Sequence, residues 1–574
     1  MTGRVRVPRV ALVAGLTALV AAGLAPATAA AGGPPAGAAR LDCGSLAGTA
    51  VPAGRIGLPT SGARVASAVV VPAAAATETV PATGTSPAVP AHPAVPEYCK
   101  VLVSIAPVDP TAPAINAQVS LPVAWNGKAM HFGGGGYDGS VPDTTANTPS
   151  APAGTPTPLA RGYATFGSDS GHQGGTAVFA LNDEALVNFG YAALKKTHDV
   201  AVALIRAGYG HRPQYMYFAG SSQGGREAIT VAQRFPADYD AVLSRVPVVP
   251  FTELQIAGNR VGASVAAGGW MNAAEIGLLS AATTAACDGL DGVTDGLIAD
   301  YPDCRPDPAA LLCPAGVDPA GTDTCLSQAQ VDTVRVVRSP LALDFPVANG
   351  VTGYPGWPAG AEAASWPLWV MGATPPSPQL PGTPENPAGF APGTSFLGSL
   401  GAQWIRYAIA RDPSLDTLTF DPDGPRWRQR IQQVTQIVDS TNPDLSAFRA
   451  RGGKLIVQEH FGDYAQSGFA GSAWFESVVD TLGPRRTADF ARLYVSPGAD
   501  HGGGGAPSQV DWVRVLEDWA EHGQAPGRLV LSGAVGGVQR TLPACQFPQW
   551  PQYRRGPVED AASYHCTGRE LGHS

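Results

Sequence analysis

The chain has 574 residues, a formal net charge of −9 at pH 7 and only 14% charged residues. This length can bury a large core and predicts more than one domain. The chain shows no basic patch, which argues against a nucleic-acid partner. Hydrophobic residues make up 44%, so the 70 glycines and 54 prolines predict long ordered loops rather than a disordered chain.

The N-terminus has the features of a secretion signal. Three arginines within the first nine residues precede an apolar run over residues 10–24, and small residues at 27–29 offer a cleavage site. The run is short and rich in alanine and glycine, which disfavours a membrane anchor. We expect residues 1–31 to be a signal peptide and residues 32–42 a linker. The mature protein is then secreted, with no membrane contact.

The predicted elements alternate between strands and helices in two separate parts of the chain. Strand-like runs and helical patterns follow one another in this order: strands at 64–71, 101–105, 117–121, 126–132 and 162–167, a helix at 183–207, a strand at 215–218, a helix at 226–235, strands at 241–246, 454–458 and 489–495, and a helix around residues 512–519. The alternation is lost between residues 250 and 450. An α/β fold is therefore expected, with catalytic parts at 43–249 and 451–574 and an insertion at 250–450.

Residues 219–225 read Ala-Gly-Ser-Ser-Gln-Gly-Gly, a G-x-S-x-G motif centred on Ser222. A strand before it and a helix after it are the context of a nucleophile elbow, a sharp turn that exposes the serine hydroxyl. Neighbouring glycines let the backbone crowd at such a turn. The alternative is an ordinary Gly/Ser-rich loop in a glycine-rich chain.

Two residues downstream complete a candidate triad. Asp463 lies just past the strand at 454–458, and His501 follows the strand at 489–495. The order Ser222, Asp463, His501 is the order of α/β-hydrolases. Imidazole can accept the serine proton near neutral pH, and a carboxylate can orient the ring.

Other side chains compete for these roles. His460, also at a strand end, is the realistic substitute base. Asp500 is the rival acid, but its position next to His501 in the sequence places it badly for reaching the ring. His172 lies in a polar turn and is expected to be structural.

Four consecutive glycines at 133–136 follow a strand-like run. In α/β-hydrolases such a loop supplies one N–H group of the oxyanion hole, and the residue after the nucleophile supplies the other. We predict this role for Gly134, Gly135 and Gln223. A flexible loop is the alternative for the glycines taken alone.

Eight cysteines in an exported chain predict four disulfides. Zinc is disfavoured, because no C-x-x-C pair is present. Proximity favours sequential couples, although the sequence allows many pairings: Cys43 with Cys99, Cys287 with Cys304, Cys313 with Cys325, and Cys545 with Cys566.

The 250–450 segment is interpreted as a lid over the active site. Six of the eleven tryptophans fall in it and could stack on an aromatic substrate, although packing of an irregular domain is the alternative for most of them: Trp270, Trp357, Trp366, Trp369, Trp404 and Trp427.

Three carboxylates alternate with glycines inside this segment, at Asp288, Asp291 and Asp295. Such a loop can curl its oxygens around Ca²⁺, which takes six to eight oxygen ligands. The loop is no EF-hand, since the final bidentate glutamate is absent. An acidic surface turn is the alternative.

Together these motifs resemble those of the tannase and feruloyl esterase family of secreted α/β-hydrolases. The resemblance spans nearly all of the mature chain and is carried by residues 126–128, 133–136, 162–165, 169–174, 220–226, 288–297, 462–463 and 497–501. It implies an α/β-hydrolase fold with a large lid inserted between nucleophile and acid.

The resemblance also implies a reaction and a structural Ca²⁺ ion. The expected activity is serine-dependent cleavage of small aromatic-acid esters (galloyl, feruloyl or chlorogenate) from plant polymers. A mono-(hydroxyethyl) terephthalate hydrolase belongs to the same family, so a polyester-derived substrate is the alternative. The implied calcium ligands are the side chains of Asp288, Asp291 and Asp295 and the carbonyls of Val293 and Leu297.

One departure concerns the triad. The resemblance implies a disulfide between cysteines immediately before the nucleophile and immediately after the histidine, where this chain has Ser221 and Gly502. The triad must then be held by packing and the surrounding turns. The missing bridge also suggests a second hypothesis, a non-catalytic binding protein on the same scaffold. A third hypothesis is a peptidase or lipase on the same fold, which no feature of the sequence distinguishes from an esterase.

Overall fold

The computed structural model describes residues 41–77, 92–317, 322–376 and 380–569. The predicted signal peptide (1–31) and all but the last two residues of the predicted linker (32–42) lie outside these residues. Among the described helices, none combines the length and the apolar character needed to cross a membrane.

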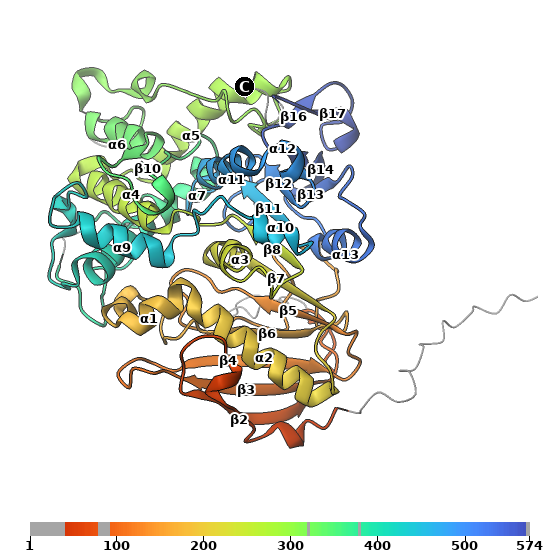
Figure 1. Cartoon of the computed structure of the whole chain (residues 1–574). Coiled ribbons are helices and arrows are strands. Elements are labelled where there is room, and N and C mark those ends of the chain that lie inside the picture. Colours follow the sequence, from red (N-terminus) through yellow and green to blue (C-terminus); the bar gives the residue numbers. More distant parts are fainter. Residues whose placement is uncertain (1–40, 78–91, 318–321, 377–379, 570–574) are drawn as a thin grey trace, which may run out of the picture. The chain divides into compact units, whose positions relative to one another are not determined.

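An eleven-stranded mixed sheet runs through the molecule in the order β1-β2-β3-β4-β6-β5-β7-β8-β11-β12-β15 (Figure 1). Its strands are β1 (Ala50–Val51), β2 (Gly62–Val71), β3 (Tyr98–Ala106), β4 (Ile115–Pro122), β5 (Lys128–Phe132), β6 (Ala164–Ser168), β7 (Tyr215–Ser221), β8 (Ala241–Arg245), β11 (Lys454–His460), β12 (Ala491–Ser496) and β15 (Cys545–Gln546). Every strand predicted from the sequence is present, and the α/β fold is confirmed.

The strands that precede the candidate site residues are parallel to one another. β5 pairs in parallel with β6 and β7, and the parallel series continues through β8, β11 and β12. Carboxyl ends of parallel strands meet at one edge of a sheet, which is where α/β folds bind ligands. The glycine run, Ser222, Asp463 and His501 all follow strands at this edge.

Helices cover both faces of the sheet. On one face α2 (Ala193–Tyr209), α3 (Gln223–Arg234) and α11 (Gly468–Leu482) share a hydrophobic cluster with the strands. On the other face α13 (Trp512–His522) buries the three residues predicted to share a helical face, Trp512, Leu516 and Trp519, against β7 and β12. The parallel part of the sheet is thus buried on both sides, as parallel strands usually are.

The helix predicted at 183–207 differs from expectation in its first part. It consists of α1 (Asp183–Val187), a π-helical turn (Asn188–Ala192) and α2. The turn packs against the insertion, since a Cβ atom on Gly190 would lie 2.6 Å from the carbonyl oxygen of Ile437. The Arg226 guanidinium donates to the carbonyls of Phe189 and Gly190 at 3.0 and 2.9 Å. These bonds join the π turn to α3.

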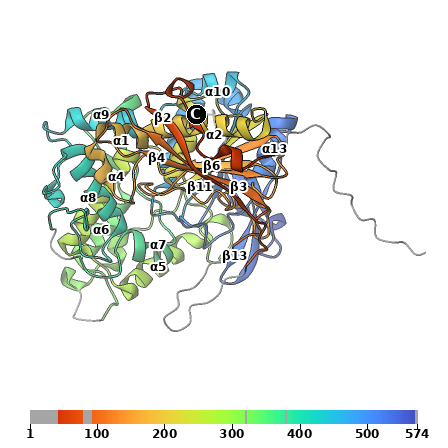
Figure 2. The same ribbon diagram turned by 90° about the horizontal axis from the view of Figure 1, so that it is seen from below.

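Main-sheet strands stop at β8 and resume at β11, and the intervening chain is mostly helical. Its elements are α4 (Phe251–Ser264), α5 (Ala273–Cys287), α6 (Gln328–Arg338), β9 (Leu341–Ala342), β10 (Gly353–Tyr354), α7 (Glu362–Trp369), α8 (Phe396–Trp404), α9 (Arg428–Val438) and α10 (Ser446–Ala450). Figure 2 shows α4, α6 and α8 beside the strands rather than among them. Most residues of a second hydrophobic cluster belong to the insertion, and Phe179 and Phe189 from the preceding chain also pack in it.

After β12 the chain adds α13 and two short hairpins, β13 (Val530–Val535) with β14 (Val538–Pro543) and β16 (Trp550–Tyr553) with β17 (Tyr564–Thr567). Four disulfides cross-link the chain, and the predicted sequential pairing is confirmed for every couple: Cys43–Cys99, Cys287–Cys304, Cys313–Cys325 and Cys545–Cys566.

Candidate active site

Ser222 lies on a strained turn between β7 and α3, with φ 61° and ψ −120°. A non-glycine residue in such a conformation costs about 1–3 kcal/mol and persists only where the surroundings enforce it. The glycines beside it are sterically required. A Cβ atom on Gly220 would lie 2.1 Å from the carbonyl oxygen of Gly224, and one on Gly224 would lie 2.7 Å from that of Gly134. The geometry is that of a nucleophile elbow.

His501 and Asp463 are directly paired. The Nδ1 atom of His501 lies 2.7 Å from Oδ2 of Asp463. The Asp463 side chain is fully buried, whereas that of His501 is 20% exposed. The other carboxylate oxygen of Asp463 accepts the backbone N–H groups of Ala465 at 2.7 Å and Gln466 at 3.3 Å. These amides fix the carboxylate, and the carboxylate leaves Nε2 of the imidazole free to act as a base.

The rival residues are engaged elsewhere. Nδ1 of buried His460 lies 2.7 Å from the carbonyl oxygen of Asp500, and burial followed by the nearby Arg245 charge lowers the pKa of His460 well below its ordinary value. The Asp500 carboxylate accepts the Gly504 N–H at 2.8 Å. His172 contacts the carbonyl of Tyr137 at 2.7 Å, and burial lowers the pKa of His172 to about 4.

Arg245, which sequence reasoning missed, connects the elbow to the histidine loop. From the end of β8 its Nη1 donates to Ser221 Oγ and its Nη2 to the His501 carbonyl, both at 2.7 Å. The residue before Ser222 and the candidate base are therefore held by one guanidinium. A signal existed in the sequence, namely a charged residue ending the apolar strand that follows the elbow helix.

The glycine run at 133–136 and the start of α3 supply the backbone N–H groups considered for the oxyanion hole, but Gly134 differs from the prediction. The Gly134 N–H donates to Oε2 of Glu227 at 2.9 Å, so this group is already bonded. The N–H groups of Gly135 and Gln223 have no protein acceptor among the described residues. Glu227 and Asp138, both buried beneath this loop, were not singled out from the sequence. Burial raises the pKa of each of these two carboxyls.

Aromatic residues of the insertion adjoin His501. The Trp369 ring lies 5.2 Å from the imidazole and 5.1 Å from the Phe396 ring, measured between centroids. Phe396 is 42% exposed, which is unusual for so large an apolar side chain. By contrast Trp357, Trp366 and Trp404 are buried in the core of the insertion. Of these four tryptophans, only Trp369 contacts the triad.

The Asp-Gly loop is closed by the Cys287–Cys304 disulfide, and its Leu297 packs with Ala499 and Ala506 of the histidine loop. Asp288 and Asp291 are buried, with 5% and 1% exposure. Asp288 accepts the Gly296 N–H, and Asp295 pairs with Arg540 and accepts the Tyr564 hydroxyl at 3.0 Å. No other cationic side chain bonds this loop in the described part of the chain, so two buried carboxylates lack a counter-charge. That donor chemistry fits a hard divalent cation.

Among the described residues, three potential ligand atoms lie within 4.8 Å of one another at His198, Asp199 and Asp238, whereas the carboxylates of Asp288, Asp291 and Asp295 do not converge to that extent. The Lys195 ammonium group bonds both carboxylates of this trio, at 2.8 Å to Asp199 and 2.9 Å to Asp238. A protein cation therefore already neutralises the cluster.

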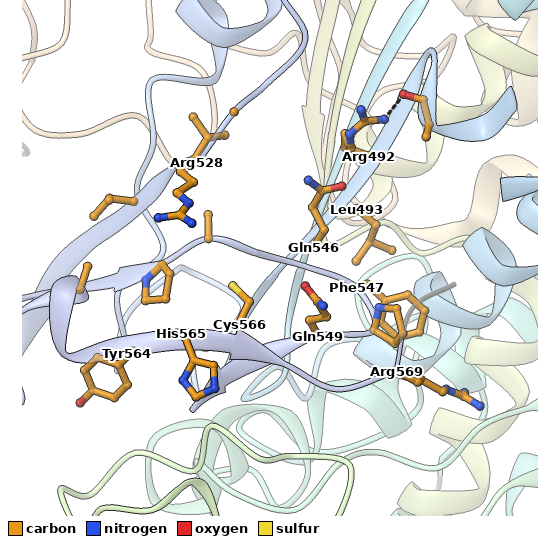
Figure 3. A pocket seen from close by; sticks show the side chains of 18 of the residues that line it. Arg492, Leu493, Arg528, Gln546, Phe547, Gln549, Tyr564, His565, Cys566 and Arg569 are labelled. Atoms are coloured by element: carbon orange, nitrogen blue, oxygen red, sulfur yellow. Dashed lines mark hydrogen bonds between the residues drawn. The ribbon is translucent and has the colours of Figure 1, made fainter. Parts of the chain in front are cut away.

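A cavity of about 1440 Å³ lies between α12 (Pro484–Ala488), β12 and the C-terminal hairpins. Figure 3 shows Arg492, Arg528 and Arg569 around it. Neither the triad nor the insertion contributes to its lining, so the cavity is separate from the candidate active site.

The family model described as "Tannase and feruloyl esterase" matches residues 99–567. The chain belongs to this family. An uncharacterized esterase of Agrobacterium fabrum is 36% identical over 541 residues, covering 91% of this chain and 92% of the relative. A mono(2-hydroxyethyl) terephthalate hydrolase of Piscinibacter sakaiensis is 29% identical, covering 82% and 85%.

Solved structures agree on the fold. Feruloyl esterase B from Aspergillus oryzae superposes with a TM-score of 0.74 at 24% identity, covering 89% of this chain and 98% of that one. Tannin acyl hydrolase from Aspergillus niger gives a TM-score of 0.63 at 19% identity, covering 89% and 93%. The predicted α/β-hydrolase fold is confirmed, and this family member is a carboxylic-ester hydrolase.

Proposed function

We propose that Ser222, His501 and Asp463 form the catalytic triad of this esterase. The observation that carries the proposal is the 2.7 Å contact between His501 Nδ1 and Asp463 Oδ2. Arg245 also joins the loop that carries His501 to the elbow that carries Ser222. Ser222 Oγ attacks the ester carbonyl while His501 takes its proton. The imidazolium then protonates the leaving alcohol, and water, activated by the same imidazole, releases the acid from the acyl-enzyme.

The N–H groups of Gly135 and Gln223 would stabilise the oxyanion, because neither donates to an acceptor in the part of the chain that the structure describes. Gly134 would support the hole instead of donating to it, since its N–H is held by Glu227. Loss of one oxyanion donor typically costs about 100- to 1000-fold in rate.

Ser222→Ala tests the nucleophile. We expect hydrolysis of a chromogenic aryl ester to fall to background and labelling by a fluorophosphonate probe to disappear, with the thermal unfolding curve unchanged. Turnover by this variant would exclude Ser222. Absence of both turnover and labelling in the wild-type protein would favour the non-catalytic alternative.

The insertion would act as a lid that selects an aromatic acyl group. Trp369 and Phe396 support this role. Trp369 presents a partly exposed ring next to His501, Phe396 packs on Trp369, and aromatic rings stack favourably. Esters of ferulic or gallic acid fit this description. So does mono(2-hydroxyethyl) terephthalate, the substrate named for one relative.

Trp369→Ala tests this substrate class. We expect kcat/KM for methyl ferulate to drop about tenfold, equivalent to about 1.4 kcal/mol of lost stacking, and that for p-nitrophenyl acetate to change little. Trp427→Ala, a half-buried tryptophan of the same insertion packed on Phe420, is the matched control. Equal losses on both substrates would contradict an aromatic acyl site. Methyl gallate, chlorogenate and mono(2-hydroxyethyl) terephthalate complete the panel.

We further propose secretion and a structural Ca²⁺ ion. Four disulfides support export, since such bonds persist in oxidising compartments. The side chains of Asp288, Asp291 and Asp295 and the carbonyls of Val293 and Leu297 would hold the ion, which would neutralise the loop and supply no catalytic chemistry.

Metal removal tests the ion directly. Elemental analysis should find one calcium per chain, and EGTA should lower the unfolding temperature in a way that added Ca²⁺ reverses. Asp291→Asn should weaken retention of the metal, whereas Asp332→Asn, at an exposed position of α6 in the same insertion, should not. A protein purified without calcium, with an EGTA-insensitive melting curve, would refute the proposal.

A further inference from the structure

Arg245 is placed where three elements of the candidate active site meet. It ends β8, where its Cα atom pairs with that of Ser221 in β7, next to Ser222, and with that of Gln458 in β11. Its own carbonyl oxygen accepts the Ser222 N–H at 3.0 Å. The residue is only 6% exposed, although arginine is almost never buried without partners. Both its backbone and its side chain therefore contact the nucleophile elbow.

The guanidinium connects two segments that are far apart in the sequence. One terminal nitrogen donates to Ser221 Oγ and the other to the carbonyl of His501, each at 2.7 Å. The two nitrogens belong to one rigid plane, so the distance between their acceptors is fixed by covalent geometry. Arginine is the side chain best suited to such two-point contact.

The histidine loop needs an external anchor. His501 is followed by four glycines, two of which, Gly503 and Gly505, have positive φ values. Other bonds tie the loop to β11, through His460 to Asp500 and through Gln458 to Ser508. In the described part of the chain, the Arg245 bonds are the direct hydrogen-bonded link between this loop and the β7 elbow.

Nearby carboxyl groups partly offset the burial of the Arg245 charge. Burial lowers the pKa of the guanidinium, and the carboxylates of Asp463, Asp500 and Glu459 oppose that shift. Arginine begins with so high a pKa that the group stays protonated over the working range of the enzyme.

We propose that Arg245 is a positioning residue that sets the separation between Ser222 and His501. Its two hydrogen bonds hold the elbow and the histidine loop together, as a covalent link between positions 221 and 502 would. The acceptors lie on Ser221 and on His501, which is next to Gly502. The proposal rests on the proposed triad, although the adjacency of the two positions can be tested without any turnover.

Arg245→Met is the first test. A misplacement of about 1 Å in a catalytic group costs about 100-fold in rate, so we expect kcat to fall about 10- to 100-fold while KM changes less than about twofold. Arg245→Lys keeps the charge but lacks the planar fork and should recover only part of kcat. Arg260→Met is the matched control, because Arg260 also donates to backbone carbonyls but lies in α4. It should leave kcat unchanged.

A covalent substitute is the second test. In the triple variant Arg245→Gly, Ser221→Cys, Gly502→Cys, we expect the new thiols to oxidise to a disulfide and kcat to return to within about threefold of wild type. Arg245→Gly alone should remain impaired. Thiol titration and peptide mapping report the bridge independently of activity, so a variant that is merely unfolded is recognised by its free thiols and altered near-UV spectrum.

The outcomes separate the two proposals. Full kcat in Arg245→Met, a formed bridge without recovery of kcat, or persistent free thiols at 221 and 502 in the folded triple variant would each overturn the role of Arg245. Retained activity in Ser222→Ala would instead overturn the proposed triad, whatever the thiols show.

Discussion

At the scale of single residues, the acid of the proposed triad is held more firmly than the base. Asp463 is buried and bonded by two backbone amides as well as by His501, whereas the imidazole is partly exposed. A carboxylate so fixed selects the imidazole tautomer that presents a bare nitrogen to the serine. The activity of the triad should therefore depend on the negative charge and the orientation of the Asp463 carboxylate, and an uncharged side chain of the same shape should not replace it.

Asp463→Asn should keep the fold and lose most of the activity. The amide can donate to Nδ1, which would stabilise the wrong tautomer, and a drop in kcat of about 10⁴ is expected from the equivalent change in a serine protease. Stopped assays on a chromogenic ester at neutral pH give the rate. Asp500→Asn, the same change in the rival acid, should cost less than about tenfold. A reversed order would make Asp500 the acid.

A second residue-scale consequence concerns Asp138. Burial, with the nearby Glu227 carboxyl adding to it, raises the pKa of Asp138 well above its ordinary value. The folded chain thus keeps a proton that the unfolded chain releases above about pH 4, and stability falls with rising pH by up to about 1.4 kcal/mol per unit from this group. Asp138→Asn removes that dependence.

Urea unfolding at several pH values between about 5 and 8 tests the Asp138 effect. The variant should become more stable relative to wild type as pH rises. Asp183→Asn, a matched change at an exposed carboxylate, should give a difference that does not vary with pH. Parallel curves for Asp138→Asn and wild type would mean that Asp138 is ionised in the folded state.

At the scale of elements, the π turn before α2 shows how one side chain joins three segments. Arg226 of α3 donates to carbonyls of the π turn and to the carbonyl of Val438 at the end of α9. It is fully buried, so its loss would leave several buried carbonyls unbonded. The helix after the elbow is thereby connected to the insertion.

Arg226→Met should lower the free energy of unfolding by several kcal/mol, because each buried carbonyl left unbonded costs about 1–3 kcal/mol. Arg206→Met, an exposed arginine on α2, should cost less than about 0.5 kcal/mol. Denaturant titration followed by tryptophan fluorescence measures both. If Arg226→Met lowers the free energy of unfolding no more than Arg206→Met does, water must bond the buried carbonyls in place of the guanidinium.

At the scale of the whole molecule, the insertion and the sheet are coupled beside the triad. Tyr464, next to Asp463, is buried and donates its hydroxyl to the carbonyl of Pro358 in the insertion at 2.8 Å. Glu362 and Arg338 continue this contact as a buried ion pair. The loop that carries the acid is thus fixed partly by the segment proposed to bind substrate.

Tyr464→Phe should therefore reduce both stability and kcat. We expect a loss of about 1 kcal/mol in unfolding free energy for the hydrogen bond and a severalfold fall in kcat. Tyr209→Phe removes a comparable bond, from its hydroxyl to the Pro122 carbonyl at 2.6 Å, and should lower stability alone. Equal kinetic effects of the two variants would contradict the coupling.

The sequence by itself determined the features that depend on local residue patterns and on distance along the chain. The apolar runs gave the strands, the G-x-S-x-G motif gave the elbow, and proximity gave the disulfides, because each depends on residues close in the chain or on a motif with one steric solution. Only the tertiary structure decided the rest. It brought Arg245 between Ser221 and His501, gave the Gly134 N–H to Glu227, placed a π turn around Gly190 within the long helix and set Trp369 against the imidazole. These outcomes depend on which side chains meet once distant segments have packed together. A charged residue at the end of an apolar strand marks Arg245 as unusual, but no short-range pattern encodes which partners it meets.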